Sequence, residues 1–179
     1  VRSSAASDVY KRQVQFYDTF MQALQNISPV PIRMMNVEGE AKGYYHQTEK
    51  YIAIKEDMSN VQTMKTGVHE VRHALLHDRE VMDAEGVLKD QTTKEVEAES
   101  IAYIVCNHFG LDTSEYSFTY IASWCESRDM KALKASMDTI RKTSAEIIGN
   151  IEEQMHELER ENTMPVSYTH LTLPTILRV

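Results

Sequence analysis

Hydrophobic residues recur at helical spacing in several long stretches of this chain. In the first stretch they follow one another at intervals of three or four residues, which puts them on one face of a helix. We therefore expect a helix over residues 14–27, and the two prolines that follow prevent it from continuing. The apolar residues of this face are Phe16, Phe20, Leu24 and Ile27.

Shorter apolar runs bounded by turn residues follow the prolines. Residues 32–35 predict a short strand. Residues 44–46 and 51–54 predict a hairpin, with the polar linker 47–50 as its turn. We therefore expect a small antiparallel sheet that lies beside the helices.

Helical patterns return after the hairpin and fill the rest of the chain. Ser59 suits the N-cap of the next helix, and Thr92 or Thr93 suits the cap of the one after it, which Gly110 closes. The expected helices cover residues 61–78, 92–109, 116–125 and 128–161. The predicted fold class is therefore α+β, mostly helical, with a long C-terminal helix.

The long helix at 128–161 allows two interpretations. Its apolar residues recur mostly every three or four positions, which favours a helix packed along the domain. Its densely charged second half is also typical of a coiled-coil arm that binds a partner or a second copy. The pattern favours packing and leaves dimerisation open.

Both ends of the chain resemble translated sequencing-adapter DNA. Residues 3–13 match one reading frame of a transposase adapter, and residues 166–175 match a frame of its reverse complement. We therefore expect 1–13 and 165–179 to be adapter-derived, rather than a disordered head and a short apolar tail. The natural domain would then span 14–164, with further domains of the full protein outside this sequence.

Charge and composition exclude several classes of function. The whole chain has a formal net charge of −8. Leaving out the two adapter-like ends removes four basic residues and one acidic residue, which leaves 15 basic and 26 acidic residues and a net charge of −11. Such an acidic domain is not expected to bind nucleic acid directly. No stretch approaches the apolar length of a membrane span, and Cys106 and Cys125 are typical of reduced thiols in a cytoplasmic protein.

The segment 69–73 reads His-Glu-Val-Arg-His and lies inside a predicted helix. Positions four apart share a helix face, so His69 and His73 can direct two imidazoles at one ion. Glu70 lies beside them, where it can reach a water molecule. Two nitrogen ligands, an open coordination position and a carboxylate base are what a zinc hydrolase needs. The sequence therefore predicts a Zn²⁺ site with Glu70 as the catalytic base.

A zinc ion in such a site needs a third protein ligand, and the following helix offers three glutamates. Glu95 and Glu99 share a face, so we expect Glu95 to bind the metal and Glu99 to accept a hydrogen bond from a ligand histidine. Glu97 is rotated by about 200° from Glu95 and should face solvent or the long helix. Ala98 and Ala102 allow close helix packing. The alternative to a metal-binding role is that these glutamates only form an acidic helix start, which the helix dipole favours.

Neither His77 nor Arg72 is expected to bind the metal. His77 lies ~6 Å beyond His73 along the helix axis, which makes it a capping or packing residue rather than a ligand. Arg72 is expected to face outward and to pair with an acidic neighbour. The donor that would stabilise an oxyanion is not determined, and Tyr120 and His77 are weak candidates.

The segment 65–77, followed by Glu95-Val96-Glu97-Ala98-Glu99, resembles the ImmA/IrrE family of zinc metallopeptidases. Segments 42–45 and 116–122 resemble its ArdC-like (LtrC-like) antirestriction-associated domains from mobile elements. The resemblance covers nearly all of 14–160. It implies a minimal zincin fold, three ligands in His69, His73 and Glu95, and Glu70 as base. Arg72 stands where the family usually has Ala or Gly.

This resemblance also implies a function and its alternatives. Its members of the ImmA/IrrE type act on helix-turn-helix repressors, so a transcriptional repressor is a candidate protein substrate. The alternative is a metal-stabilised interaction domain of an antirestriction protein with little or no peptidase activity. A third hypothesis is a purely structural metal, which four protein ligands would normally enclose.

Overall fold

The computed structural model describes residues 2–76, 89–113 and 119–163. Each helix and strand predicted between residues 14 and 76 is present. The elements are α1 (Arg2–Ile27), β1 (Ile32–Met35), β2 (Gly43–His46), β3 (Tyr51–Lys55), α2 (Asn60–Leu76), α4 (Gln91–His108), α5 (Thr119–Glu126) and α6 (Met130–Thr163). The predicted α+β class, with a small sheet and a long C-terminal helix, is confirmed.

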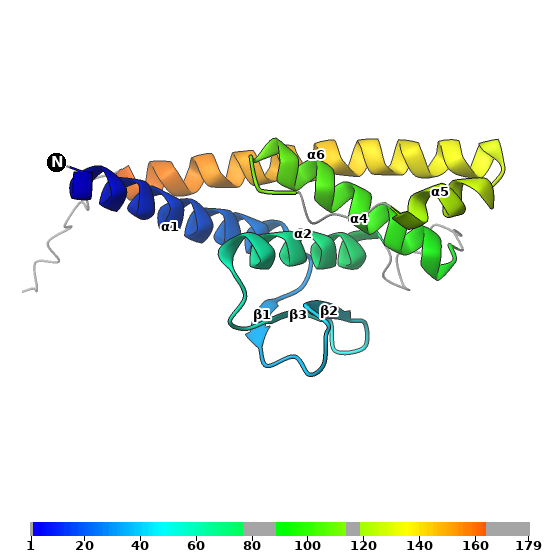
Figure 1. Ribbon diagram of the computed structural model, residues 1–179, viewed down its shortest axis with the longest axis horizontal. Helices are drawn as coiled ribbons and strands as arrows, with labels where there is room; N and C mark the ends of the chain where they lie inside the picture. The colour runs from blue at the N-terminus through cyan, green and yellow to red at the C-terminus, as the bar shows by residue number, and fades with distance from the viewer. Residues whose placement is uncertain (1, 77–88, 114–118, 164–179) are drawn as a thin grey trace, which may run out of the picture.

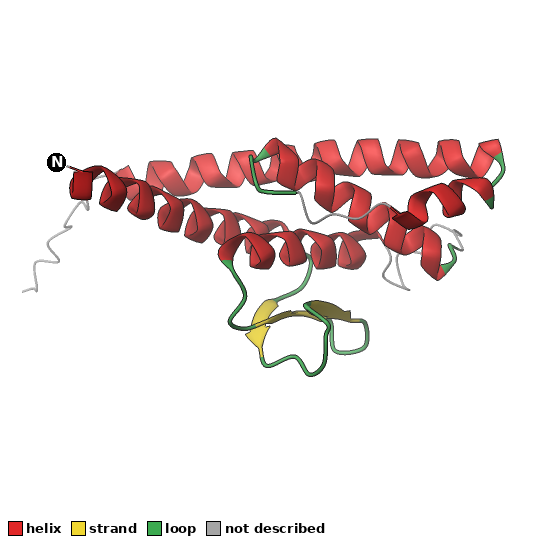
Figure 2. Ribbon diagram, viewed as in Figure 1, coloured by secondary structure: helices red, strands yellow, loops and turns green. Residues whose placement is uncertain are grey.

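Helix α2 lies between the sheet and the other helices, as Figure 1 shows. It packs against β2 and β3 on one side and against α1 and α4 on the other. The long helices α1 and α6 run alongside each other, and α4 fills the space between α2 and α6. Figure 2, which is coloured by secondary structure, shows that the strands all lie together on one side of the helical layer. A residue on α2 can therefore face either the sheet or α4.

The sheet is mixed, with the strand order β1-β3-β2. The predicted hairpin is confirmed, because β2 pairs antiparallel with β3. The prediction of a wholly antiparallel sheet is wrong, because β1 pairs parallel with β3. Strand β3 is the most apolar of the three and is almost entirely buried, so it takes the central position. It thereby separates β1 from β2, and β1 runs parallel to it.

One hydrophobic core joins the sheet to all the long helices. Strand β3 contributes Ile52 and Ile54 on the face that α2 covers. Burying an aliphatic side chain of this size stabilises a fold by about 1.5–3 kcal/mol relative to leaving it exposed. The fully buried helical residues of this core include Phe20, Leu24, Val68, Val71, Ile101, Val105 and Ile151. The position of α2 is thus fixed by apolar contacts on two sides.

The helix starts follow from local hydrogen bonds. Ser59 caps α2 as predicted, because its Oγ accepts a hydrogen bond from the backbone N–H of Gln62. The cap of α4 is Asp90, not Thr92 or Thr93, and its carboxylate accepts from the N–H of Thr93 at 2.8 Å. Arg128 forms an ion pair with this carboxylate. An aspartate suits a cap at least as well as a threonine, and here a cation also holds it.

Helix α6 packs along the domain, as the favoured interpretation of its pattern predicts. It contacts α1 and α4 through a buried face that includes Ser144, Ile147 and Ile151. Near its start, Met130 and Met137 remain exposed. A role for α6 in dimerisation stays a prediction. Among the described residues, every helix is too short or too polar to cross a membrane.

The start of β2 touches α2 at Gly43. A Cβ atom built on Gly43 would lie 2.6 Å from Cγ2 of Thr66 and 2.7 Å from the carbonyl oxygen of Ala53. Both separations are shorter than van der Waals contact, and the second atom belongs to the backbone. The absence of a side chain at residue 43 therefore allows β2 to approach α2 this closely.

Substitution of this glycine should weaken the junction between sheet and helix. We expect Gly43→Ala to lower the free energy of unfolding by about 1–3 kcal/mol, as overpacking usually does. Gly149→Ala is the matched control, because a Cβ there meets nothing within 4 Å. In the middle of α6 it should stabilise by about 0.5–1 kcal/mol. Urea denaturation measures both, and equal changes in the two variants would contradict the close-contact explanation.

Candidate metal centre

Helix α2 directs consecutive side chains to different neighbours. At about 100° per residue, His69 and His73 share one face, and Glu70 and Arg72 lie on either side of it. The histidine face looks toward α4. Glu70 lies on the side of β2, and Arg72 lies on the side of the α4 backbone. Side chains of the five-residue motif therefore face both the sheet and helix α4.

The two histidines meet at their Nε2 atoms, which are 3.1 Å apart. Their rings are tilted by 66° to each other, with centroids 4.8 Å apart. Both side chains are mostly buried but keep an opening to the surface. Two imidazole nitrogens on adjacent turns of one helix thus point at the same small volume.

The carboxylate of Glu95 reaches this volume from α4. Its Oε2 lies 3.5 Å from Nε2 of His69, and its Oε1 lies 3.6 Å from Nε2 of His73. One donor atom from each of the three side chains lies within 4.8 Å of the others. Ligands at zinc distances of about 2.0–2.1 Å are ~3.4 Å apart in a tetrahedron. The donor set and its spacing fit a Zn²⁺ ion, and the predicted convergence of these residues is confirmed.

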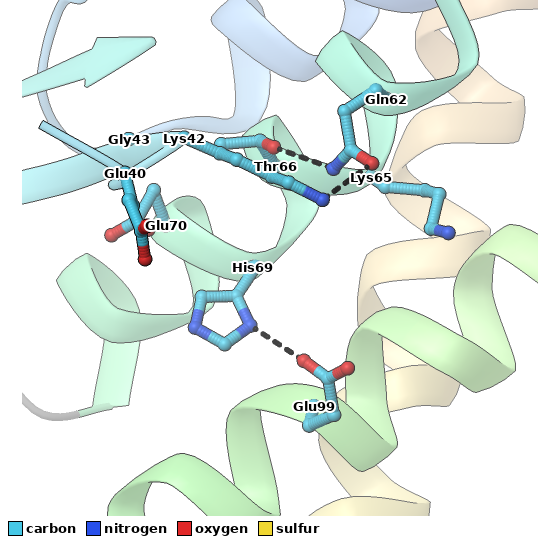
Figure 3. Close-up of a pocket in the computed structure, with 9 residues that line it drawn as sticks. All are labelled: Glu40, Lys42, Gly43, Gln62, Lys65, Thr66, His69, Glu70 and Glu99. Atoms are coloured by element: carbon cyan, nitrogen blue, oxygen red, sulfur yellow. Dashed lines mark hydrogen bonds and ion pairs between the residues drawn. The ribbon is translucent and has the colours of Figure 1, made fainter. Parts of the chain in front are cut away.

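Glu99 lies one helical turn beyond Glu95 and contacts the other nitrogen of His69. Its Oε2 is 3.3 Å from Nδ1 of His69, the contact drawn in Figure 3. Glu99 therefore contacts one of the two histidines, as predicted. A carboxylate on Nδ1 fixes the ring orientation and leaves Nε2 for a metal.

The surroundings shift the pKa values of the two histidines in opposite directions. Burial lowers the pKa of His69, but hydrogen bonds to Glu95 and Glu99 outweigh it and raise this pKa to about 9. Burial lowers the pKa of His73, and Glu95 only partly opposes that effect. Contacts with both histidines hold the pKa of Glu95 far below its ordinary value. Without a metal, a protonated His69 therefore faces an ionised Glu95.

Glu70 is the most enclosed carboxylate next to the ligand set, with 8% of its surface exposed. Burial raises the pKa of Glu70 to about 7, although His69 and a hydrogen bond from the backbone of Tyr45 oppose the shift. Tyr45 belongs to β2, so the sheet holds this carboxylate in position. A carboxyl group with a pKa near 7 can both take up and release a proton at neutral pH.

Two hollows flank the histidines, and both include Gly43, His69 and Glu70. The first has a volume of about 290 Å³ and is shown in Figure 3, with Lys42 and Glu99 in its wall. The second has a volume of about 390 Å³ and extends past His73 and Glu95. The ligand set therefore lies in a cleft between β2 and α4, with room for a chain on either side.

Arg72 does not face outward, and that prediction is wrong. The side chain is fully buried against α4, where its guanidinium donates to the carbonyl of Lys94 at 2.8 Å and to Glu97 at 2.9 Å. Glu97 is also fully buried and does not face solvent, and its carboxylate pairs with Arg72 of α2. Lys89 binds the same carboxylate at 2.8 Å. The expected acidic partner of Arg72 exists, but it lies in the interior because the long arginine side chain spans the helix contact.

Some residues singled out in the sequence lie outside the described part of the chain, and two contributors to the site were missed. His77 lies outside the described residues, as does the side chain of Tyr120. The missed contributors are Gly43 and the backbone of Tyr45. Gly43 carries a detectable signal, a glycine at the start of a predicted strand, which often marks a close backbone approach.

Loss of the third carboxylate should abolish tight metal binding. We expect Glu95→Ala to bind Zn²⁺ far more weakly than the wild type, because only two protein ligands remain. Glu99→Gln should lose about 10- to 100-fold in affinity, the usual effect of removing a partner of a ligand histidine. Competition with a chromophoric chelator measures both. Unchanged affinity in Glu95→Ala would show that another residue supplies the third ligand.

Metal binding should displace a proton from His69. The raised pKa of about 9 keeps this imidazole protonated at pH 7, and a metal requires the neutral ring. We expect Zn²⁺ binding at pH 7 to release about one proton, and the affinity to rise with pH up to that pKa. Calorimetry in buffers with different ionisation enthalpies counts the protons. Glu70→Gln removes the other group that titrates near neutrality, and binding without proton release in that variant would contradict the charge assignment.

Comparison with known proteins identifies a relative of part of this chain. The chain is 36% identical over 104 residues to an uncharacterized protein of Bacillus anthracis, pXO2-81. The match covers 58% of this chain but only 17% of that protein. No family model and no solved structure matches the chain. The relative therefore shows that related sequence occurs within a much longer protein, and it assigns no activity.

Proposed function

We propose that this domain is a zinc-dependent metallopeptidase that hydrolyses a peptide bond in a protein substrate. The observation that carries the proposal is the convergence of His69, His73 and Glu95 beside the enclosed carboxylate of Glu70. Two histidines and a glutamate are a ligand set of catalytic zinc sites. The resemblance to ImmA/IrrE peptidases rests on the same residues.

A Zn²⁺ ion held by His69, His73 and Glu95 would act as a Lewis acid that polarises a peptide carbonyl and acidifies water. Glu70 would accept a proton from the attacking water as it adds to the scissile carbonyl. The same carboxyl group would then deliver that proton to the departing amine. Its burial, which raises its pKa, would make it a stronger base than an exposed carboxylate. Glu99 would keep the ring of His69 in a fixed orientation.

The cleft beside β2 supports a peptide substrate in particular. β2 is an edge strand of the sheet and lies next to Glu70, which accepts a hydrogen bond from the backbone of Tyr45. An edge strand offers unpaired backbone groups to which an extended peptide can add. A peptide bound along β2 would pass Glu70 and the two histidines. The hollows on either side would then receive its side chains.

A catalytic metal is favoured over a structural one by the ligand count. The described residues bring together a group of three ligands, whereas structural zinc sites usually have four protein ligands. A buried base next to the ligands has no purpose in a purely structural site. The alternative of a weakly active interaction domain within an antirestriction protein shares this metal centre. The two proposals differ only in the rate of peptide hydrolysis that they predict.

The resemblance suggests a biological setting for the peptidase. We infer a substrate among proteins rather than nucleic acids, because the 14–164 domain has a net charge of −11. A transcriptional repressor encoded with a mobile element is the candidate substrate. A cytoplasmic location remains part of this proposal.

Removing the base should separate catalysis from metal binding. We expect Zn²⁺-loaded Glu70→Gln to keep its metal but to cleave peptides about 10²- to 10⁴-fold more slowly, the usual contribution of a general base. A proteome-derived peptide library, read by mass spectrometry, offers many candidate sequences at once and does not require the target to be identified. Glu56→Gln changes an exposed carboxylate outside the cleft and should cleave at the wild-type rate. Equal rates in Glu70→Gln and the wild type would refute the mechanism.

A further inference from the structure

Arg72 combines a position inside the metal-binding motif with complete burial. It lies between Val71 and His73 on α2, and 0% of its surface is exposed. An unpaired charge in such an environment would be strongly unfavourable, so a buried guanidinium needs well-placed acceptors. The acceptors of Arg72 are therefore informative about what the side chain does.

Both acceptors belong to the turn of α4 that carries Glu95. Nη1 of Arg72 donates to the backbone carbonyl of Lys94 at 2.8 Å, and Nη2 donates to Oε2 of Glu97 at 2.9 Å. Lys94 immediately precedes Glu95, and Glu97 follows it by two residues. The guanidinium thus holds the α4 backbone on both sides of the third ligand. The other end of this connection is on α2, where Arg72 immediately precedes His73.

Burial does little to hold Glu95 itself. Its side chain is 41% exposed, and its contacts apart from the two histidines include a hydrogen bond from Gln91 on the same helix. A carboxylate this open to solvent depends on its backbone for its distance from the histidines. That backbone is attached to α2 through Arg72.

Lys89 strengthens the same connection from the segment before α4. Its Nζ lies 2.8 Å from Oε1 and 2.9 Å from Oε2 of Glu97. Glu97 thereby receives one cation from α2 and a second from the chain that leads into α4. The carboxylate is fully buried, so these contacts are shielded from solvent.

We propose that Arg72 is a positioning residue for the metal centre, which fixes α4 against α2 so that Glu95 meets His69 and His73. The inference rests on the proposed metal centre. Arginine suits this task because its planar guanidinium holds two donors in a fixed geometry, whereas the three N–H donors of a lysine share one freely rotating nitrogen. A purely structural ion pair would stabilise the fold without affecting the metal, and this difference can be measured.

The decisive variant is Arg72→Lys, which keeps the charge but loses the fork. We expect it to bind Zn²⁺ about 10- to 100-fold more weakly, as for other residues that orient ligands. The visible absorption of bound Co²⁺ should also change, because it reports the geometry of the ligands. Ile147→Ala is the matched control: it removes a buried side chain of α6 and should lower the melting temperature, and it lies on neither α2 nor α4.

A second variant decides the question if Arg72→Lys does not fold. Glu97→Gln keeps an oxygen acceptor for Arg72 and leaves the bond to Lys94 in place, so we expect it to bind Zn²⁺ more weakly than the wild type, but by less than the 10- to 100-fold loss expected for removal of the guanidinium. Wild-type affinity and an unchanged Co²⁺ spectrum in every variant that folds would overturn the positioning role. The same holds if Ile147→Ala loses as much affinity at an equal loss of melting temperature. If the wild type binds no metal, the metal centre itself is refuted and this inference with it.

Discussion

The close contact between α2 and α4 is the constraint on which the candidate site depends. The two histidines lie on one helix and the third carboxylate on the other, so a small change in their separation would disperse the ligands. Ala98 and Ala102 are fully buried and lie close to Glu95 and Glu99 on the helical wheel of α4, so their small side chains allow close approach on that side of the helix. Arg72 and Glu97 add directional bonds across the same contact. Small residues therefore set the distance, and the ion pair sets the register.

The sheet imposes a second constraint, on Glu70 rather than on the ligands. β3 is buried at the centre of the sheet, so β2 is left at the edge that faces α2. Gly43 lets β2 approach α2 closely, and the backbone of Tyr45 contacts the Glu70 carboxylate. The proposed base is thus positioned by the sheet and the proposed ligands by the helices. A change in either layer would affect one function of the motif and spare the other.

Periodicity predicted the elements well because helix and strand formation depends on neighbours in sequence. The shared faces of His69 and His73, and of Glu95 and Glu99, follow from the 3.6-residue repeat alone. The parallel pairing of β1 was missed because strand order depends on which strand is most deeply buried. The burial of Arg72 and Glu97 was missed for a related reason. A helical wheel gives the direction of a Cβ atom but not the reach of a long side chain.

The site places Glu70 and Glu95 in different environments, which suit the different tasks proposed for them. Contact with the histidines keeps Glu95 ionised at any ordinary pH, as a metal ligand must be. Burial raises the pKa of Glu70 to about 7 in the metal-free protein. A divalent cation nearby would favour the ionised form and lower that pKa, so about 7 is an upper limit for the loaded site. Glu70 would then be mainly a base at neutral pH, and its enclosure would keep it a stronger one than an exposed carboxylate.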